Sequence, residues 1–186
     1  MLLDTKTSVT DYLLGESKNS HKSEFWAGQV VAMAGASPTH NILVSNLITL
    51  LNNCLRQKDC LVLPSDMLVK VPACESYFYP DVVIVCQKPE YEENQGVTAL
   101  LNPTIIIEVL SPSTAQKDNT DKLECYLNLQ SLMEYHLVDS RKKYVKSYYK
   151  QNEKDWILHI YPNTEEKVRI GECELEFKEI YWKTNL

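Results

Sequence analysis

The chain has 186 residues, a length that suits one compact domain and that needs neither disulfides nor a structural metal to bury a sufficient core. Its composition, with 44% hydrophobic and 24% charged residues, is ordinary for a globular protein and excludes collagen-like and low-complexity sequences. The net charge of −6 excludes binding of a polyanion through overall charge, so a nucleic acid would need a local basic patch or metal ions.

The N-terminal region predicts a short helix and a hairpin. Residues 8–14 suit one or two turns of helix. Residues 22–26 and 29–33 flank Ala27-Gly28, a pattern that is typical of a β-hairpin with a two-residue turn.

A long helix is predicted after Ser37, which suits a helix N-cap and is followed by Pro38 at the first helical position. Apolar residues then recur at helical spacing as far as about Arg56. They are Leu43, Leu47, Leu50, Leu51, Cys54 and Leu55.

The rest of the chain predicts strands with one helix between them. Residues 77–86, with the run VVIVC, and residues 104–110, TIIIEVL, suit strands buried on both faces. A loop and N-cap at residues 111–114 precede a helix over residues 115–129. Shorter strands are expected over residues 60–63, 66–71, 133–139, 142–149, 156–161 and 173–177, and a surface loop or short helix over residues 88–95. This order predicts an α/β or α+β fold with helices on a mixed central sheet, in a single domain, residues 1–186, with a core over about 22–161.

The six cysteines form no CxxC pair and no zinc-finger cluster. The N-terminal sequence MLLDTKTSVTDYLL contains Asp4 and lacks the apolar core of a secretory signal, and the longest apolar runs fall far short of the roughly 20 residues of a membrane helix. We therefore expect a cytoplasmic protein whose cysteines are reduced and pack as small hydrophobic residues, rather than a disulfide framework.

Two acids interrupt the buried strands. Asp81 opens the run VVIVC, directly after Pro80, and Glu108 lies within IIIEVL. A buried, ionised carboxylate is costly unless it is paired or bound to a metal. If the two strands are neighbours and both side chains lie on one face, the carboxylates form a hard-oxygen site suited to Mg²⁺ or Mn²⁺.

Lys122 follows Asp118 by four residues, so the two share one face of the predicted helix. Taken alone, this spacing favours a surface ion pair that contributes well under about 1 kcal/mol. Next to Asp81 and Glu108, the ammonium could instead orient or help to deprotonate a water molecule, or neutralise a phosphate.

The stretches YPDVVIVC, IIIEVLSPST, KDNTDKLECY and MEYHLVD, in this order, resemble the Uma-two family of restriction-endonuclease-like proteins, within the PD-(D/E)xK nuclease superfamily. With GQVVAMAGASPTHNILVSNL, the resemblance covers about residues 24–149. It implies a restriction-endonuclease-like fold with Asp81 and Glu108 as the motif acids. The chain departs from the motif at Leu110, where a lysine is expected, and the resemblance implies that Lys122 takes that role.

The same resemblance implies an endonuclease that cleaves DNA with Mg²⁺ or Mn²⁺ held by Asp81, Glu108 and the backbone carbonyl of Val109. Superfamily members that cut both strands often act as dimers, so it also implies a homodimer. For His40, in the predicted helix start SPTH, two interpretations stay open: a helix-start residue with a hydrogen-bond partner, or a catalytic residue.

A few polar residues favour structural roles. Asp66 and Glu24 are more typical of a turn and a strand than of the cleft, and Ser111 and Ser113 of loop or N-cap positions than of nucleophiles.

One basic, aromatic-rich stretch lies near the C-terminal strands. Its residues are Lys142, Lys143, Tyr144, Lys146, Tyr148, Tyr149, Lys150 and Tyr161. We favour an exposed strand with alternating side chains, and the alternative is a face that contacts phosphates.

Two other functions remain open. One is a catalytically inactive nuclease-fold protein that binds nucleic acid or another protein, and the other is a phosphohydrolase of small molecules, because a fold alone does not fix function.

Overall fold

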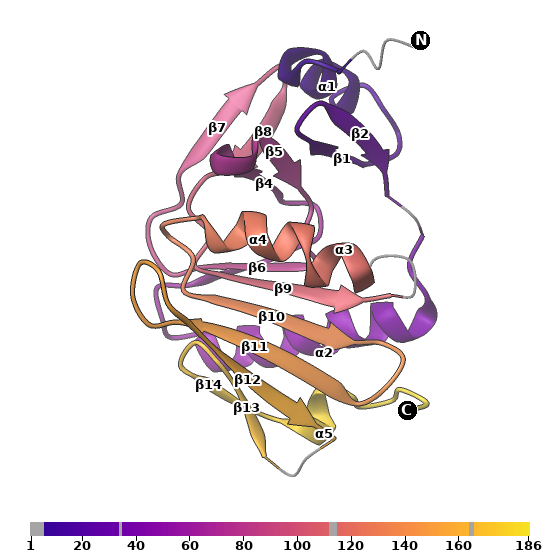
Figure 1. Cartoon of the computed structure of the whole chain (residues 1–186). Coiled ribbons are helices and arrows are strands. Elements are labelled where there is room, and N and C mark those ends of the chain that lie inside the picture. The colour runs from indigo at the N-terminus through magenta and orange to yellow at the C-terminus, as the bar shows by residue number, and fades with distance from the viewer. Residues whose placement is uncertain (1–5, 34, 112–114, 164–165) are drawn as a thin grey trace.

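The structure is a computed structural model that describes residues 6–33, 35–111, 115–163 and 166–186, without the side chains of residues 116 and 117. Its framework consists of two six-stranded sheets (Figure 1). In spatial order, the central sheet contains β12 (Trp156–Pro162), β11 (Tyr144–Lys150), β10 (Glu134–Asp139), β9 (Ile105–Leu110), β6 (Val82–Val85) and β3 (Leu61–Pro64). The second sheet contains β2 (Gln29–Ala32), β1 (Ser23–Trp26), β5 (Ser76–Phe78), β4 (Leu68–Val71), β8 (Val97–Leu100) and β7 (Tyr91–Asn94).

Both sheets are mixed, because β9 pairs in parallel with β10, and β4 with β8, while the other strand pairs are antiparallel. The helices are α1 (Val9–Glu16), α2 (Pro38–Leu55), α3 (Ala115–Asn119), α4 (Asp121–Leu127) and α5 (Phe177–Ile180), with a 3₁₀ turn at Pro72–Cys74. A separate hairpin joins β13 (Lys167–Ile170) to β14 (Cys173–Glu176). The predicted mixed sheet flanked by helices is confirmed.

The long helix α2 forms as its sequence predicts. The Ser37 hydroxyl accepts a hydrogen bond from the His40 N–H at 3.2 Å, Pro38 starts the helix, and the buried leucines follow at four-residue spacing. They are Leu43, Leu47, Leu51 and Leu55, and they pack on the face of the central sheet that presents Val82, Ile84 and Ile107. Helices α3 and α4 lie over the opposite face (Figure 1), where Tyr126 packs with Val83 and Ile106.

Strands β6 and β9 are neighbours at the centre of this sheet. They pair antiparallel with Val82 opposite Ile107, so Asp81 and Glu108 each lie one position beyond that pair. Both runs are fully buried, because helices cover both faces of the sheet. The register thus brings the two strand acids to the same end of the strand pair.

Several segments differ from the sequence-based expectations. Residues 88–95 contain the edge strand β7, which turns into the unexpected β8 through Gln95 and Gly96, both at positive φ. The helix expected over residues 115–129 is broken at Thr120 into α3 and α4, and β13 was not expected at all. The hydrophobic core also extends past residue 161, since Val168 and Phe177 pack in the same cluster as α2.

The cysteines are the main correction, because the structure pairs all six of them. The disulfides are Cys54–Cys173, Cys60–Cys86 and Cys74–Cys125. The partners are 119, 26 and 51 residues apart, so their proximity arises only from the fold and leaves no spacing motif in the sequence. Among the helices of the described residues, none is long and apolar enough to cross a membrane.

Candidate active site

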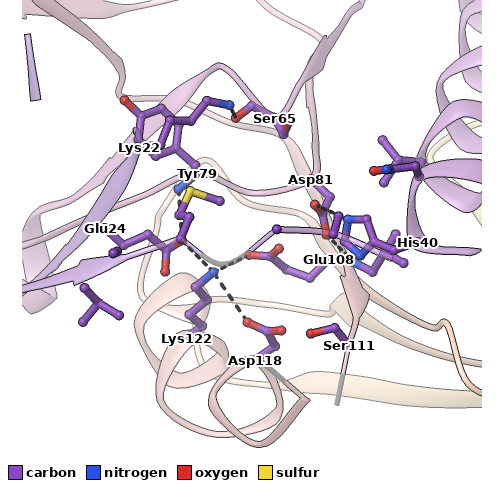
Figure 2. Close-up of a pocket in the computed structure, with 18 residues that line it drawn as sticks. Lys22, Glu24, His40, Ser65, Tyr79, Asp81, Glu108, Ser111, Asp118 and Lys122 are labelled. Atoms are coloured by element: carbon purple, nitrogen blue, oxygen red, sulfur yellow. Dashed lines mark hydrogen bonds and ion pairs between the residues drawn. The ribbon is translucent and has the colours of Figure 1, made fainter. Parts of the chain in front are cut away.

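A pocket of about 470 Å³ lies where the β1–β2 hairpin, the start of α2, the adjacent ends of β6 and β9, and the α3–α4 segment meet (Figure 2). Charged residues from each of these elements line it. They are Lys22, Glu24, His40, Asp81, Glu108, Asp118 and Lys122.

Two hydrogen bonds fix the Asp81 side chain at the start of β6. One carboxylate oxygen accepts a hydrogen bond from the backbone N–H of Val109 at 2.7 Å, and the other lies 3.0 Å from His40 Nε2. Burial lowers the pKa of His40, but the hydrogen bond and the charge of Asp81 outweigh it and raise the pKa above its ordinary value. The first turn of α2 thereby orients the Asp81 carboxylate.

Glu108 is deeply buried, with 3% of its surface exposed. Its Oε1 accepts hydrogen bonds from Lys122 Nζ at 3.1 Å and from the Tyr126 hydroxyl at 3.3 Å. Burial raises the pKa of Glu108 well above its usual range. Lys122 opposes this shift, while the charges of Asp118, Asp81 and Glu24 add to it.

Lys122 lies among three carboxylates and is itself only 6% exposed. Its Nζ is 2.8 Å from Glu24 Oε1, 3.1 Å from Glu108 Oε1 and 3.5 Å from Asp118 Oδ1, and the dashed lines of Figure 2 meet at this nitrogen. Burial lowers the pKa of Lys122, but the three carboxylates outweigh burial and raise it. The side chain is therefore a fixed positive charge at neutral pH.

Negative charge exceeds positive charge in the pocket. Four carboxylates from β1, β9, α3 and the start of β6 face two ammonium groups, of Lys22 and Lys122, and one imidazole. Hard oxygen donors with surplus negative charge suit Mg²⁺ or Mn²⁺ in chemical type. Within the described part of the chain, however, no group of three or more His, Cys, Asp or Glu side chains is arranged to hold a metal ion. Mg²⁺ commonly binds through only one or two carboxylates and completes its shell with water or phosphate, so metal binding by Asp81 and Glu108 stays a prediction.

The structure brings the predicted site residues together: Asp81, Glu108, Val109, His40 and Lys122 all line this pocket. Their catalytic and metal-binding roles stay predictions. Ser111 lines the same pocket, whereas Ser113 lies outside the described residues.

Asp66 lies outside this group. Its side chain is 80% exposed and forms an ion pair with Lys22, whose Nζ also donates to the Ser65 carbonyl at 2.9 Å at the pocket rim.

Two side chains of the pocket, Asp118 and Glu24, were underrated from the sequence. The Asp118–Lys122 pair is buried rather than a surface ion pair, and Glu24 is a direct partner of Lys122. The Glu24 carboxylate also accepts a hydrogen bond from the Tyr79 N–H at 3.2 Å, which ties the hairpin to the segment before Asp81. The four-residue spacing of Asp118 and Lys122 was a usable signal, but nothing local to Glu24 indicated its distant partner.

Asp81 directly before β6, the buried Glu108 on the neighbouring β9, and a lysine on the helical segment after β9 form an arrangement like that of restriction-endonuclease-like proteins. A crystal structure from Anabaena variabilis, described as a "putative nuclease belonging to DUF820", has this fold, with a TM-score of 0.71 at 18% identity over 88% of this chain and 91% of that one.

The chain belongs to the Uma2 family, whose model, described as "Putative restriction endonuclease", matches residues 9–178. The uncharacterized protein sll1609 of Synechocystis sp. is 35% identical over 173 residues, which cover 93% of this chain and 94% of the relative. A second protein of that organism, the uncharacterized protein slr1290, is 33% identical over 156 residues, covering 84% and 80%.

Proposed function

We propose that the protein is a metal-dependent endonuclease that hydrolyses phosphodiester bonds of DNA in the pocket of Asp81, Glu108 and Lys122. The observation that carries the proposal is the convergence of two strand acids and a buried lysine in one open pocket, in a chain of a family described as restriction endonucleases. Buried carboxylates in such numbers are costly for stability, and a reaction at this pocket explains why they are present.

The protein's own groups have separable tasks in this proposal. Lys122 stays protonated, so it acts as a positive charge against the scissile phosphate rather than as a base. His40 and the Val109 N–H hold the Asp81 carboxylate in one orientation, which reduces the reorganisation needed during the reaction.

Mg²⁺ or Mn²⁺ would be held by the side chains of Asp81 and Glu108, with the Val109 carbonyl as a further predicted ligand. When bound, the cation would lower the pKa of an attacking water and supply charge against the phosphate.

Plasmid nicking tests the proposal. The wild-type protein with Mg²⁺ or Mn²⁺ should convert supercoiled DNA to nicked or linear DNA, and Asp81→Asn and Glu108→Gln should each slow this by about a hundredfold or more. Asp66→Asn is the matched control, because it removes an exposed acid that does not line the pocket and should leave cleavage unchanged. An absence of cleavage of DNA and RNA by the wild type with either metal contradicts the proposal.

A catalytically inactive nuclease-fold module is the second candidate. It is favoured by Leu110, which replaces the motif lysine and is buried in the core. Thermal unfolding with and without Mg²⁺ separates metal binding from turnover. A Tm increase with Mg²⁺ that Asp81→Asn abolishes, without DNA cleavage by the wild type, favours the inactive module.

Two further expectations stay predictions. A homodimer is expected from the superfamily resemblance, and sedimentation would measure it. A cytoplasmic location is the other, and the three disulfides count against it.

A further inference from the structure

Strand β11 presents an alternating row of tyrosine and lysine side chains on one face of the central sheet. Val145, Ser147 and Tyr149 of this strand are buried. The alternate positions are partly exposed, and they are Tyr144, Lys146, Tyr148 and Lys150. The edge strand β12 widens this surface, because Trp156, Leu158 and Ile160 lie opposite Lys150, Tyr148 and Lys146.

Positive charge is concentrated there, against the sign of the whole chain. Residues 140–151 contain five basic and no acidic residues, although the net charge of the protein is −6. Lys146 Nζ donates to the Asn119 side-chain oxygen at 2.9 Å, and Lys150 Nζ donates to the Gln130 carbonyl at 2.9 Å. Both of these partners are neutral. Among the described residues, neither lysine forms an ion pair with a carboxylate.

The aromatic rings of this surface are paired with these charges. Lys142 Nζ lies 4.4 Å from the centre of the Tyr144 ring, and Lys150 Nζ lies 5.8 Å from the centre of the Trp156 ring. The aliphatic neighbours Leu158 and Ile160 are 45% and 42% exposed. The surface thus combines flat rings, cations and apolar area.

The same surface lies next to the pocket and is not covered by a helix. Helix α3 contacts β9 and α4 contacts β10. Neither helix crosses β11 or β12 in Figure 1, although Tyr148 and Trp156 pack in part against the cluster that contains Tyr126 of α4. Lys146 contacts Asn119, whose chain neighbour Asp118 lines the pocket and contacts Lys122. A polymer that crosses α3 from the pocket would therefore meet this face.

We infer that this face of β11 and β12 binds a single-stranded segment of nucleic acid. Lys142, Lys146 and Lys150 contact its phosphates, and unpaired bases stack on Tyr144 and Trp156. Charge complementarity selects a polyanion, and the rings select exposed bases, since stacking on aromatic side chains is how proteins hold single strands without reading sequence. A duplex hides its base faces and would use only the lysines.

The test measures binding by fluorescence anisotropy in EDTA, so that it does not depend on cleavage. The probes are a labelled oligo-dT strand of about 20 nucleotides and a duplex of equal length. The triple variant Lys142→Gln/Lys146→Gln/Lys150→Gln should bind the single strand about tenfold more weakly at low salt. The slope of log K against log salt should also fall by about 2, because each phosphate that a lysine neutralises adds about 0.7 to this slope for a single strand.

A matched triple variant, Lys18→Gln/Lys88→Gln/Lys178→Gln, removes the same charge from exposed lysines elsewhere and should bind like the wild type. Tyr144→Ala should weaken single-strand binding about tenfold and leave duplex binding unchanged, whereas Tyr144→Phe keeps the ring and should bind normally. Thermal unfolding checks that each variant is folded.

Three results would overturn the inference: equal losses in the two triple variants, equally tight binding of the duplex with no effect of Tyr144→Ala, or no binding of the strand by the wild type. Displacement of the strand by polyglutamate at equal charge would indicate a site for acidic peptides instead. If the protein nicks DNA but the substitutions on this face leave strand binding unchanged, only this inference is overturned. If the protein binds the strand through this face but does not nick DNA, only the nuclease proposal is overturned.

Discussion

Lys122 illustrates how burial changes the meaning of a local pattern. Its spacing from Asp118 is typical of an exposed helix pair, yet its Nζ lies within 3.1 Å of both Glu24 and Glu108, which come from separate strands. In contrast, Asp81 and Glu108 could be predicted because an acid inside an apolar run is a signal within one segment. Glu24 could not, since its importance depends on contacts between segments far apart in the chain.

Removal of the Lys122 charge should destabilise the fold. Lys122→Met would leave Glu24, Glu108 and Asp118 buried without their cation, a change that typically costs about 3–5 kcal/mol. Urea denaturation at pH 7 measures the free energy of unfolding. Lys58→Met is the control, because this lysine pairs with Glu172 at the exposed surface, and its removal should cost less than about 1 kcal/mol.

Adding Glu24→Gln and Glu108→Gln to Lys122→Met should restore part of the stability, since two of the uncompensated charges disappear. A single Lys122→Met variant as stable as the wild type would contradict this account of the pocket.

At the scale of elements, length and periodicity decided what could be predicted. The helix α2 and the strand β9 have long apolar patterns, and they form where expected. The single strand expected over residues 77–86 is wrong, because residues 79–81 divide it into β5 of the second sheet and β6 of the central sheet. The short strands β7 and β8 were not predicted, because β7 has the polar sequence YEEN at a sheet edge and is stabilised by its pairing partner rather than by burial. The break between α3 and α4 at Thr120 was not predicted either, because no proline or glycine marks it in the sequence.

The disulfide Cys74–Cys125 ties α4 to the turn between β4 and β5, about one helical turn beyond Lys122. The double variant Cys74→Ser/Cys125→Ser should lose up to about 4 kcal/mol of stability on the chain-entropy model for a 51-residue separation. Hydrogen exchange of the α4 amides should quicken. The control is Cys60→Ser/Cys86→Ser, which removes a disulfide between β3 and β6. If hydrogen exchange in α4 quickens equally in both double variants, the Cys74–Cys125 disulfide does not specifically hold α4 in place.

Glu134 joins β10 to the β13–β14 hairpin. Its carboxylate lies 3.0 Å from His136 Nε2, 2.8 Å from the Gly171 nitrogen and 3.3 Å from Arg169 Nη1. Burial raises the pKa of Glu134, but the hydrogen bonds from His136 and Gly171 and the charge of Arg169 outweigh burial, so the pKa lies below its ordinary value.

Because the folded-state pKa is lowered, Glu134 contributes stability above about pH 4.5 that is lost as the pH falls through the folded-state pKa. Glu134→Gln should therefore cost about 1–3 kcal/mol at pH 7, and the difference from the wild type should shrink below about pH 4.5. Urea denaturation at pH 7 and at about pH 3.5 measures both values. Glu174→Gln, at an exposed position of β14, should show no such trend.

At the scale of the whole molecule, the fold class was predictable and the arrangement in two sheets was not. The order of strands and helices indicates a mixed sheet, and this suffices for the class. The second sheet pairs β1 with β5 and β4 with β8, contacts between segments that no local pattern records. The three disulfides belong to the same category, because each joins cysteines that only the complete fold brings together.

The Cys54–Cys173 link has a topological consequence for protease digestion. It encloses the chain from α2 to β14, so a protease that cuts once anywhere between these two cysteines leaves both fragments covalently joined. The exposed connection at residues 151–155 is a suitable place for such a cut. A protein nicked there should migrate as one species on a denaturing gel without reductant and as two once dithiothreitol is added.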